Sequence, residues 1–399
     1  MRLNLIKNTA LLFVVIFLSS ETKCPSQNQK SLLVGANQLE LYLPLIKNKK
    51  LGIVANQTSV IFKGPYENNF THLVDSLKEL GISIQKVFAP EHGYRGQADA
   101  GEYIKNGVDI KTGLEIVSLY GKNRKPSPET LKDLEVVLFD IQDVGTRFYT
   151  YVSTLHYMME ACASLNIPLI LLDRPNPNGH YIDGPVLDIR YKSFIGMHPV
   201  PIVHGMTLGE FANMINGEGW LNNNLKCNLT VIPISNYNHK TPYLLPIKPS
   251  PNLPNKKAIN LYPSLCLFEG TNVSIGRGTQ AQFQVFGSPY FEAEKYTYRF
   301  TPKPNFGAKN PKFKGQICYG KYLKKAASLN EIQLSWLIEA YQNSKDKSVF
   351  FNSFFTKLAG QTTLQSKIEN GWTASEIKKS WTNDLNLFIE KRAKYLLYP

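Results

Sequence analysis

The residues best suited to chemistry are carboxylates that come directly after short apolar segments of the chain. The apolar run at residues 82–89 is followed by residues 90–96, with the sequence PEHGYRG. Here a carboxylate, Glu91, has a histidine beside it and two nearby glycines that let a ligand approach the backbone. Glu91 is therefore our candidate general acid, with His92 and Arg95 as candidate ligand contacts. The alternative, a loop carboxylate that caps the next helix, fits the position and the neighbours less well.

A second polar segment lies at residues 140–149, with the sequence DIQDVGTRFY. Two acids, an amide, an arginine and a tyrosine so close together are more than a solvated loop needs. Asp140 suits a structural role, because its side chain can hold the turn through backbone hydrogen bonds. Asp143 is the better candidate for a second catalytic carboxylate, and Arg147 and Tyr149 are candidate substrate contacts.

Two further segments leave the choice between ligand binding and ordinary turn structure open. Residues 173–179 have the sequence DRPNPNG, whose residue types form turns unaided, so ligand contact by Asn176 is one of two balanced alternatives. Residues 268–279 contain FEGTN and GRGT, which contribute Glu269 and Arg277. Arg277 could fork onto a carboxylate ligand, although a bulge with a surface arginine explains it equally well.

The strands and helices that hold these segments in place are predicted between residues 51 and 172, where apolar strands alternate with amphipathic helices. We expect strands at residues 51–55, 82–89, 136–140 and 168–172, and a helix around residues 72–80. A second helix is expected from apolar side chains at helical spacing, namely Phe148, Tyr151, Val152, Leu155, Met158, Met159 and Cys162. Strands separated by helices predict an α/β fold with a parallel sheet and helices on both faces. Ligands bind outside the carboxyl ends of such strands, which is where the polar segments lie.

A chain of 399 residues is expected to form two domains. The Pro-rich stretch at residues 242–254 breaks the periodicity and is the predicted boundary, between a first domain at residues 30–245 and a second at residues 250–399. The second domain is smaller and also α/β, with short strands around residues 271–286 and helices near residues 334–341 and 375–395.

The N-terminus has the pattern of an export signal. Arg2 and Lys7 precede an apolar run at residues 10–18 that is too short to span a bilayer. We therefore expect a signal peptide at residues 1–23, no stable membrane span, and a periplasmic or secreted protein. Lipid anchoring through Cys24 is less favoured, because the Glu, Thr and Lys at residues 21–23 differ from the small residues that usually precede such a cysteine.

The net charge of +14 implies attraction to anionic matter, and peptidoglycan, nucleic acid and acidic lipid would all satisfy it. Because the lysines are scattered along the chain, a solvated basic surface explains the charge equally well. The cysteines beyond residue 24 form no C-x-x-C pair, which argues against a structural zinc site. Single buried thiols are the simplest expectation, with disulfides as the alternative.

Several familiar catalytic motifs are absent from the sequence. It contains no G-x-x-x-x-G-K-[ST] loop, no G-x-S-x-G elbow and no H-E-x-x-H pair, so nucleotide hydrolysis, esterase and zinc-protease functions lose their usual support. Residues 276–281, with the sequence GRGTQA, fit a dinucleotide fingerprint only loosely and open no clear helix. We expect no cofactor and no metal, and carboxylate chemistry remains.

Taken together, these segments resemble one family, the secreted two-domain glycosidases that were long catalogued as a domain of unknown function and are now described as exo-β-N-acetylmuramidases. The similarity runs in order over nearly the whole chain beyond the signal peptide and is specific for the family. It is carried by residues 52–58, 89–102, 139–151, 173–188, 198–210, 250–255, 261–289 and 381–398.

The resemblance implies a Rossmann-like domain and a smaller partner domain, with the active site in the cleft between them. It also implies a substrate, namely peptidoglycan fragments whose non-reducing end is a β-linked N-acetylmuramic acid. We expect no nucleic-acid partner. Glu91 would be the catalytic acid.

Glycosidic cleavage usually needs one protonated and one ionised carboxyl group, so further carboxylates are expected near Glu91. We expect Asp143, Glu102 and Glu269 to serve as supporting carboxylates. The lactyl carboxylate of muramic acid would pair with an arginine, and Arg277 and Arg147 are the candidates.

Two other classes of function stay open at this point. A non-catalytic protein that binds wall fragments would use the same cleft and basic surface without needing Glu91. An enzyme with a nucleotide-type cofactor would use the Rossmann-like half, but residues 54–59, with the sequence VANQTS, lack the glycines that such a cofactor requires where the first strand ends. The oligomeric state is left open.

Overall fold

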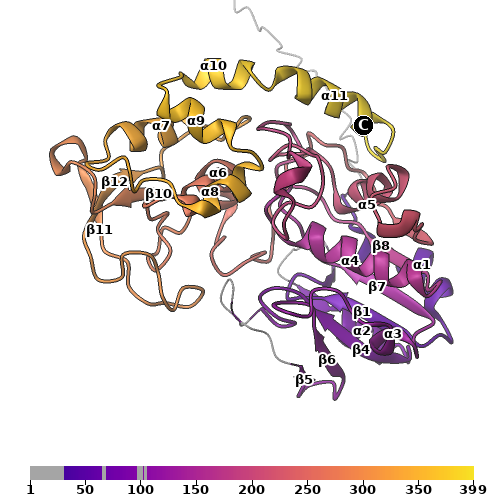
Figure 1. Cartoon of the computed structure of the whole chain (residues 1–399). Coiled ribbons are helices and arrows are strands. Elements are labelled where there is room, and N and C mark those ends of the chain that lie inside the picture. Colours follow the sequence, from indigo (N-terminus) through magenta and orange to yellow (C-terminus); the bar gives the residue numbers. More distant parts are fainter. Residues whose placement is uncertain (1–30, 65–68, 97–101, 103–105) are drawn as a thin grey trace, which may run out of the picture. The chain divides into compact units, whose positions relative to one another are not determined.

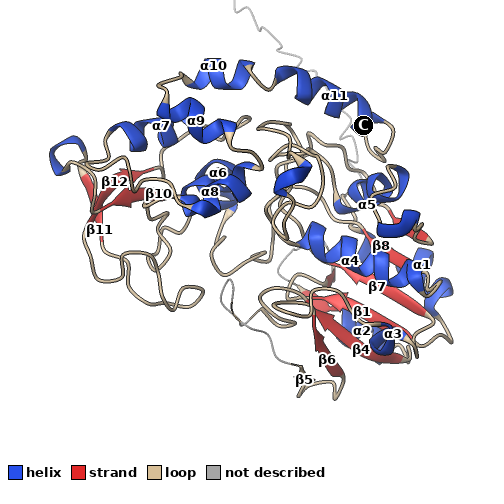
Figure 2. Ribbon diagram, viewed as in Figure 1, coloured by secondary structure: helices blue, strands red, loops and turns tan. Residues whose placement is uncertain are grey.

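A sheet of seven strands holds the elements from which the polar segments extend (Figures 1 and 2). The strand order is β5-β6-β4-β1-β7-β8-β9, and all neighbours pair in parallel except β5, which pairs antiparallel with β6. The strands are β1 (Leu51–Ala55), β4 (Ile84–Ala89), β5 (Gly107–Val108), β6 (Glu115–Ser118), β7 (Val136–Asp140), β8 (Leu169–Leu172) and β9 (Leu229–Ile232). The four predicted strands are confirmed as β1, β4, β7 and β8, whereas β5, β6 and β9 were not predicted.

This computed structural model describes residues 31–64, 69–96, 102 and 106–399, and from Leu32 to Pro399 the chain forms one compact unit. The predicted signal peptide and Cys24 lie outside the described residues. None of the helices that the structure describes is long and apolar enough to cross a membrane.

Helices cover both faces of the sheet, as predicted. Because successive residues of a strand point to opposite faces, Val137 and Phe139 of β7 pack in one core cluster, whereas Val136 and Leu138 pack in another. The first cluster includes side chains of α3 (Pro128–Leu131), α4 (Tyr151–Ser164) and α5 (Leu208–Gly217), and the second includes those of α1 (Leu39–Ile46) and α2 (Leu73–Glu79). All the residues predicted to form the apolar face of the helix after β7 are buried.

The last part of the chain contains a smaller sheet of three antiparallel strands in the order β10-β12-β11. The strands are β10 (Val285–Ser288), β11 (Tyr298–Phe300) and β12 (Cys318–Tyr322), and a separate hairpin is formed by β2 (Val60–Phe62) and β3 (Phe70–His72). The helices here are α6 (Lys256–Leu265), α7 (Leu334–Gln342), α8 (Ser353–Ala359), α9 (Thr363–Glu369), α10 (Ala374–Lys379) and α11 (Thr382–Ala393). Short 3-10 turns are η1 (Gly35–Asn37), η2 (Ile189–Tyr191), η3 (Asn222–Asn224), η4 (Cys266–Gly270) and η5 (Ala293–Lys295).

Two predictions for this part were wrong in detail. Strands were expected around residues 271–286, but only β10 forms there, because Gly276 and Gly278 adopt left-handed backbone conformations (φ 80° and 78°) that turn the chain. One helix was expected at residues 375–395, but α10 and α11 are separate. Trp381 breaks the helix between them, with ψ at 5° and its ring buried.

The C-terminal residues return to the first sheet. The Asp173 carboxylate, directly after β8, accepts hydrogen bonds from Thr207 Oγ1 (2.6 Å), the Gly209 amide (2.9 Å) and the Tyr398 hydroxyl (2.7 Å). Glu210 in the first turn of α5 accepts one from the Leu397 amide (2.9 Å). The start of α5, the end of β8 and the C-terminus are therefore joined through two buried carboxylates.

The four cysteines that the structure describes are buried free thiols, which confirms the simplest expectation for them. They are Cys162, Cys227, Cys266 and Cys318.

Candidate active site

A cavity of about 810 Å³ lies beside the carboxyl ends of β6, β4 and β7. These strands are parallel and lie close together in the sheet, so the loops that follow them gather at one edge. Glu91 follows β4, Tyr120 follows β6, and Tyr149 and Thr150 follow β7, and all four residues line the cavity. Its size is within the usual range for small-molecule sites.

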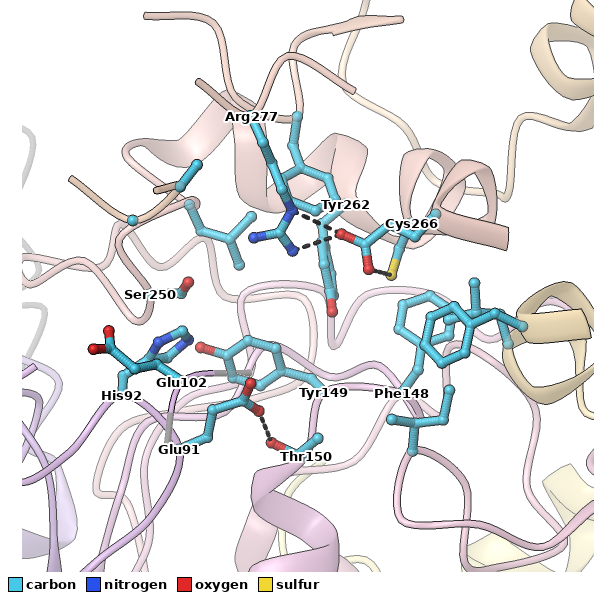
Figure 3. Close-up of a pocket in the computed structure, with 18 of the residues that line it drawn as sticks. Glu91, His92, Glu102, Phe148, Tyr149, Thr150, Ser250, Tyr262, Cys266 and Arg277 are labelled. Carbon is cyan, nitrogen blue, oxygen red and sulfur yellow. Dashed lines mark hydrogen bonds and ion pairs between the residues drawn. The ribbon is translucent and has the colours of Figure 1, made fainter. Parts of the chain in front are cut away.

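Glu91 is held by two hydroxyl groups from neighbouring loops, and Figure 3 shows the one from Thr150. Tyr120 donates to Oε1 at 3.0 Å, and Thr150, the residue before α4, donates to Oε2 at 2.7 Å. Because a hydroxyl can donate or accept, this arrangement can hold the carboxyl group whether or not it carries a proton. His92, next in the chain, has a left-handed backbone conformation (φ 69°), a strained geometry that is often found at functional sites.

The opposite wall comes from the last part of the chain, and Figure 3 shows Arg277, Tyr262 and Cys266 across the cavity from Glu91. Glu269 in η4 forms an ion pair with Arg277, whose Nε and Nη2 both donate to Oε1, at 2.8 and 2.5 Å. Both side chains keep about 25% of their surface exposed. The cavity therefore has a carboxyl group on each wall, one held by hydroxyls and one by a guanidinium.

Apolar side chains complete the lining and suit the faces of a sugar ring. They come from both parts of the chain and are Phe148, Phe194, Ile195, Leu253, Phe283, Phe354 and Leu358. The Tyr149 hydroxyl donates to the carbonyl of Pro249 at 2.8 Å, so the Pro-rich segment is fixed against the cavity wall. Across residues 31–64, 69–96, 102 and 106–399, no three His, Cys, Asp or Glu side chains are grouped so as to hold a metal ion.

Six of the residues predicted for the site line this cavity, and they come from five segments of the chain. They are Glu91, His92, Glu102, Tyr149, Glu269 and Arg277. Glu102 forms an ion pair with Lys309 at 2.6 Å, which links residues 207 positions apart.

The other predicted residues do not line the cavity, and each has partners that explain it structurally. Arg95 forms ion pairs with Asp109 (2.7 Å) and Asp75 (3.3 Å). Arg147 is buried and donates to four backbone carbonyls, those of residues 185, 200, 358 and 359. It therefore fastens the first part of the chain to the end of α8.

Asn176 is also buried, and its amide holds two loops together. Its Nδ2 donates to the carbonyl of Met206 (2.9 Å), and its Oδ1 accepts from the amide of Asn178 (2.8 Å). A Cβ at Gly145 (φ 76°) would come within 2.2 Å of this side chain, so the glycine is required by close approach as well as by its backbone conformation.

Asp143 is buried and does not line the cavity. Its Oδ2 accepts a hydrogen bond from the Gly145 amide at 2.6 Å, and its Oδ1 has no hydrogen-bond partner among the described residues. Burial raises the pKa of Asp143 to about 7, although the amides of Gly145 and Val144 act in the opposite direction.

This raised pKa predicts a pH-dependent stability difference between the protein and its Asp143→Asn variant. An acid whose pKa is raised by folding adds stability below its unfolded pKa, and that contribution is lost as the pH rises through the folded value. The stability of the wild type relative to the variant should therefore fall by about 2 kcal/mol between pH 5 and pH 7. Urea unfolding of both proteins across this range measures the effect, and a constant difference would contradict it.

Several residues of the site were not predicted. Tyr120 and Arg124 follow β6, a strand with only two buried residues and therefore no clear apolar pattern, and Thr150 lies one residue beyond the polar segment that was considered. The rule that placed Glu91 would have found Tyr120 if β6 had been recognised. Tyr262 and Phe194 carry no comparable signal.

Asp140 has a structural role, as expected, but through a side chain rather than through the backbone. Its two oxygens accept from Nε and Nη2 of Arg174 at 2.6 and 2.8 Å, and both residues are buried. Arg174 also donates to the carbonyl of Val60. This ion pair ties the end of β7 to the end of β8, immediately before the loops that approach the cavity.

An α/β chain whose aromatic-lined cavity has a carboxyl group on each wall has the arrangement of a glycoside hydrolase. The family models described as exo-β-N-acetylmuramidase NamZ, N-terminal and C-terminal, match residues 51–257 and 260–398. The peptidoglycan β-N-acetylmuramidase NamZ of Bacillus subtilis (strain 168) is 37% identical over 379 residues, which cover 90% of this chain and 89% of that protein. The chain therefore belongs to the NamZ family of exo-β-N-acetylmuramidases, as the sequence segments predicted, and is a glycoside hydrolase.

Solved structures agree with this assignment. Crystal structures of two DUF1343 family proteins from Bacteroides fragilis NCTC 9343 superpose with TM-scores of 0.83 and 0.78, at 46% and 30% sequence identity. Each comparison covers 92% of this chain and 99% of the other. The predicted α/β fold class is confirmed.

Proposed function

We propose that this chain removes N-acetylmuramic acid from the non-reducing ends of peptidoglycan fragments, in the cavity that contains Glu91. The observation that carries the proposal is the pair of carboxyl groups from different parts of the chain, Glu91 and Glu269, on opposite walls of one cavity. The activity named for the Bacillus subtilis relative supports the same substrate class.

In this proposal, Glu91 is the general acid that protonates the oxygen of the leaving sugar. Its two hydroxyl partners, Tyr120 and Thr150, fix the carboxyl group in the orientation that proton transfer needs. Glu269 is the carboxylate that assists at the anomeric carbon, because it lines the cavity whereas Asp143 is buried and does not. His92, Tyr149 and Glu102 contribute to substrate binding.

Asp143, Arg147, Arg95 and Asn176 then act on the site indirectly. Their buried or ion-paired side chains hold the loops from which the lining residues project. The domain boundary in the Pro-rich segment stays a prediction, and so does export through residues 1–23 to the periplasm or the exterior, where peptidoglycan is found.

Replacing Arg277 by alanine should lower kcat/KM by about 10- to 100-fold, because Glu269 would lose two charge-assisted hydrogen bonds. The loss should be the same for a β-N-acetylmuramide and for its uncharged lactyl carboxamide, since Arg277 is engaged by the enzyme's own carboxylate. Steady-state kinetics on both substrates test this, with Arg299→Ala on β11 as the control. A loss confined to the charged substrate would show that Arg277 binds the substrate carboxylate instead.

The proposed function is tested by release of free sugar from a chromogenic β-N-acetylmuramide, beside the matching N-acetylglucosaminide, and from peptidoglycan disaccharides of either sequence. We expect turnover only where N-acetylmuramic acid is the non-reducing residue. Binding of the muramide without turnover would support a wall-fragment binding protein. Turnover of the glucosaminide at a similar rate would contradict the proposed specificity.

A further inference from the structure

The cations in the cavity differ in whether they are available to bind an anionic substrate. Arg277 is paired with Glu269, and Lys309 with Glu102. Lys312 is largely engaged by the protein, since its Nζ contacts the backbone carbonyls of Phe268, Glu269 and Thr271. These three side chains would have to give up existing partners before they could bind a carboxylate of the substrate.

Arg124 is different. It lies in the loop between β6 and α3, lines the cavity, and is exposed. Within the part of the chain that the structure describes, no carboxylate forms an ion pair with it. Its guanidinium carbon lies 4.3 Å from the centre of the Phe194 ring, which is a cation–π contact.

A short chain of aromatic rings connects Arg124 with the catalytic carboxyl group. The Phe194 ring contacts the Tyr120 ring edge-on, with centroids 6.2 Å apart, and the Tyr120 hydroxyl donates to Glu91. Phe194 also stacks on Tyr157, with the two planes 10° apart. Arg124 and Glu91 are thus held on one side of the cavity. Burial raises the pKa of Tyr120, Glu91 raises it further, and Arg124 lowers it.

We propose that Arg124 binds the carboxylate of the lactyl ether of N-acetylmuramic acid and so selects this sugar over N-acetylglucosamine. The inference rests on the proposed function. The lactyl group is attached to the 3-oxygen of the same ring whose anomeric bond is cleaved, so its carboxylate must lie near the catalytic carboxyl groups.

The chemistry of an arginine suits this task. The cation–π contact with Phe194 occupies no hydrogen-bond acceptor, and the guanidinium N–H groups have no acceptor among the described residues, so they stay available for a two-point interaction with a carboxylate. Lys357 on α8 also lines the cavity without a carboxylate partner among the described residues, but it lies on the wall opposite β6 and would offer a single point of charge. Arg124 is therefore the better candidate.

The test varies the enzyme and the substrate together. The substrates are a chromogenic β-N-acetylmuramide with a free lactyl carboxylate and the same compound as the neutral lactyl carboxamide. For the wild type, the carboxamide should lower kcat/KM by about 10- to 100-fold, mainly through KM. For Arg124→Gln, the carboxylate substrate should lose the same factor, and the two substrates should then react at nearly equal rates.

The control is Arg190→Gln, which removes an exposed arginine that does not line the cavity, and it should keep the wild-type preference. If Arg124→Gln keeps the full preference for the carboxylate, the inference is wrong. It is equally wrong if Lys357→Gln abolishes the preference instead. If the wild type turns over neither substrate, the proposed function itself has failed, so the two failures are distinguishable.

Discussion

Replacing Glu91 by glutamine is expected to reduce turnover of a peptidoglycan disaccharide that ends in N-acetylmuramic acid by about 10²- to 10⁴-fold. Glutamine can still accept one of the two hydroxyl hydrogen bonds through its amide oxygen and can donate to the other hydroxyl through its amide N–H, but it cannot deliver a proton to the departing sugar. Substrate affinity should change little, because the variant has nearly the same shape. Single-turnover kinetics and binding measurements on the purified variant separate the two effects.

The leaving group gives a sharper form of this test. A nitrophenolate leaves without help, whereas a sugar alkoxide needs a proton, so the loss in Glu91→Gln should be much larger for the disaccharide than for a nitrophenyl muramide. Glu115→Gln, which alters an exposed carboxylate at the start of β6, is the control and should retain full activity. Equal losses on the two substrates would remove Glu91 from the role of general acid.

The sequence predicted part of the site correctly because apolar runs identify buried parallel strands, and the carboxyl ends of such strands lie at one edge of the sheet. The strands β1, β7 and β8 are short, largely apolar and buried on both faces, and β4 ends in three buried apolar residues, so such strands are recognisable. Parallel strands place their carboxyl ends at one edge, so Glu91 and Tyr149 could be assigned to one site before any coordinates were known. In contrast, β6 has only two buried residues, and the loop that contributes Tyr120 and Arg124 was missed with it.

Sequence could not separate residues that line the cavity from those that support it. Asp143, Arg147 and Asn176 have the same residue types and the same positions after strands as true lining residues. They differ in where their side chains are directed, and this depends on partners such as the carbonyl of Ala359, 212 positions from Arg147. The pairing of Glu102 with Lys309 is equally remote in sequence. Such contacts depend on how the last part of the chain packs against the first part. A local sequence pattern does not encode this packing.

Replacing Arg174 by methionine is expected to lower the free energy of unfolding by about 3–5 kcal/mol. Arg174 and Asp140 are both buried, and each of the two carboxylate oxygens accepts one guanidinium hydrogen bond. Without the arginine, the carboxylate would remain in the interior with no compensating charge. Lys132→Met, which breaks the exposed pair with Glu129, is the control and should cost well under about 1 kcal/mol.

The deficit of Arg174→Met should also depend on pH, in a direction that identifies its cause. Burial raises the pKa of Asp140 even with Arg174 beside it, and removal of the arginine leaves that effect unopposed. A group with a raised folded pKa gives its full contribution to stability below the unfolded value of 3.8 and loses it as the pH rises. The variant should therefore be closest to the wild type in acid and fall progressively behind towards neutral pH. Urea unfolding of both proteins across this pH range measures the deficit. A deficit that does not change with pH would point to lost packing around the guanidinium. A deficit that grows with pH shows that the arginine compensates a buried charge beneath the active-site loops.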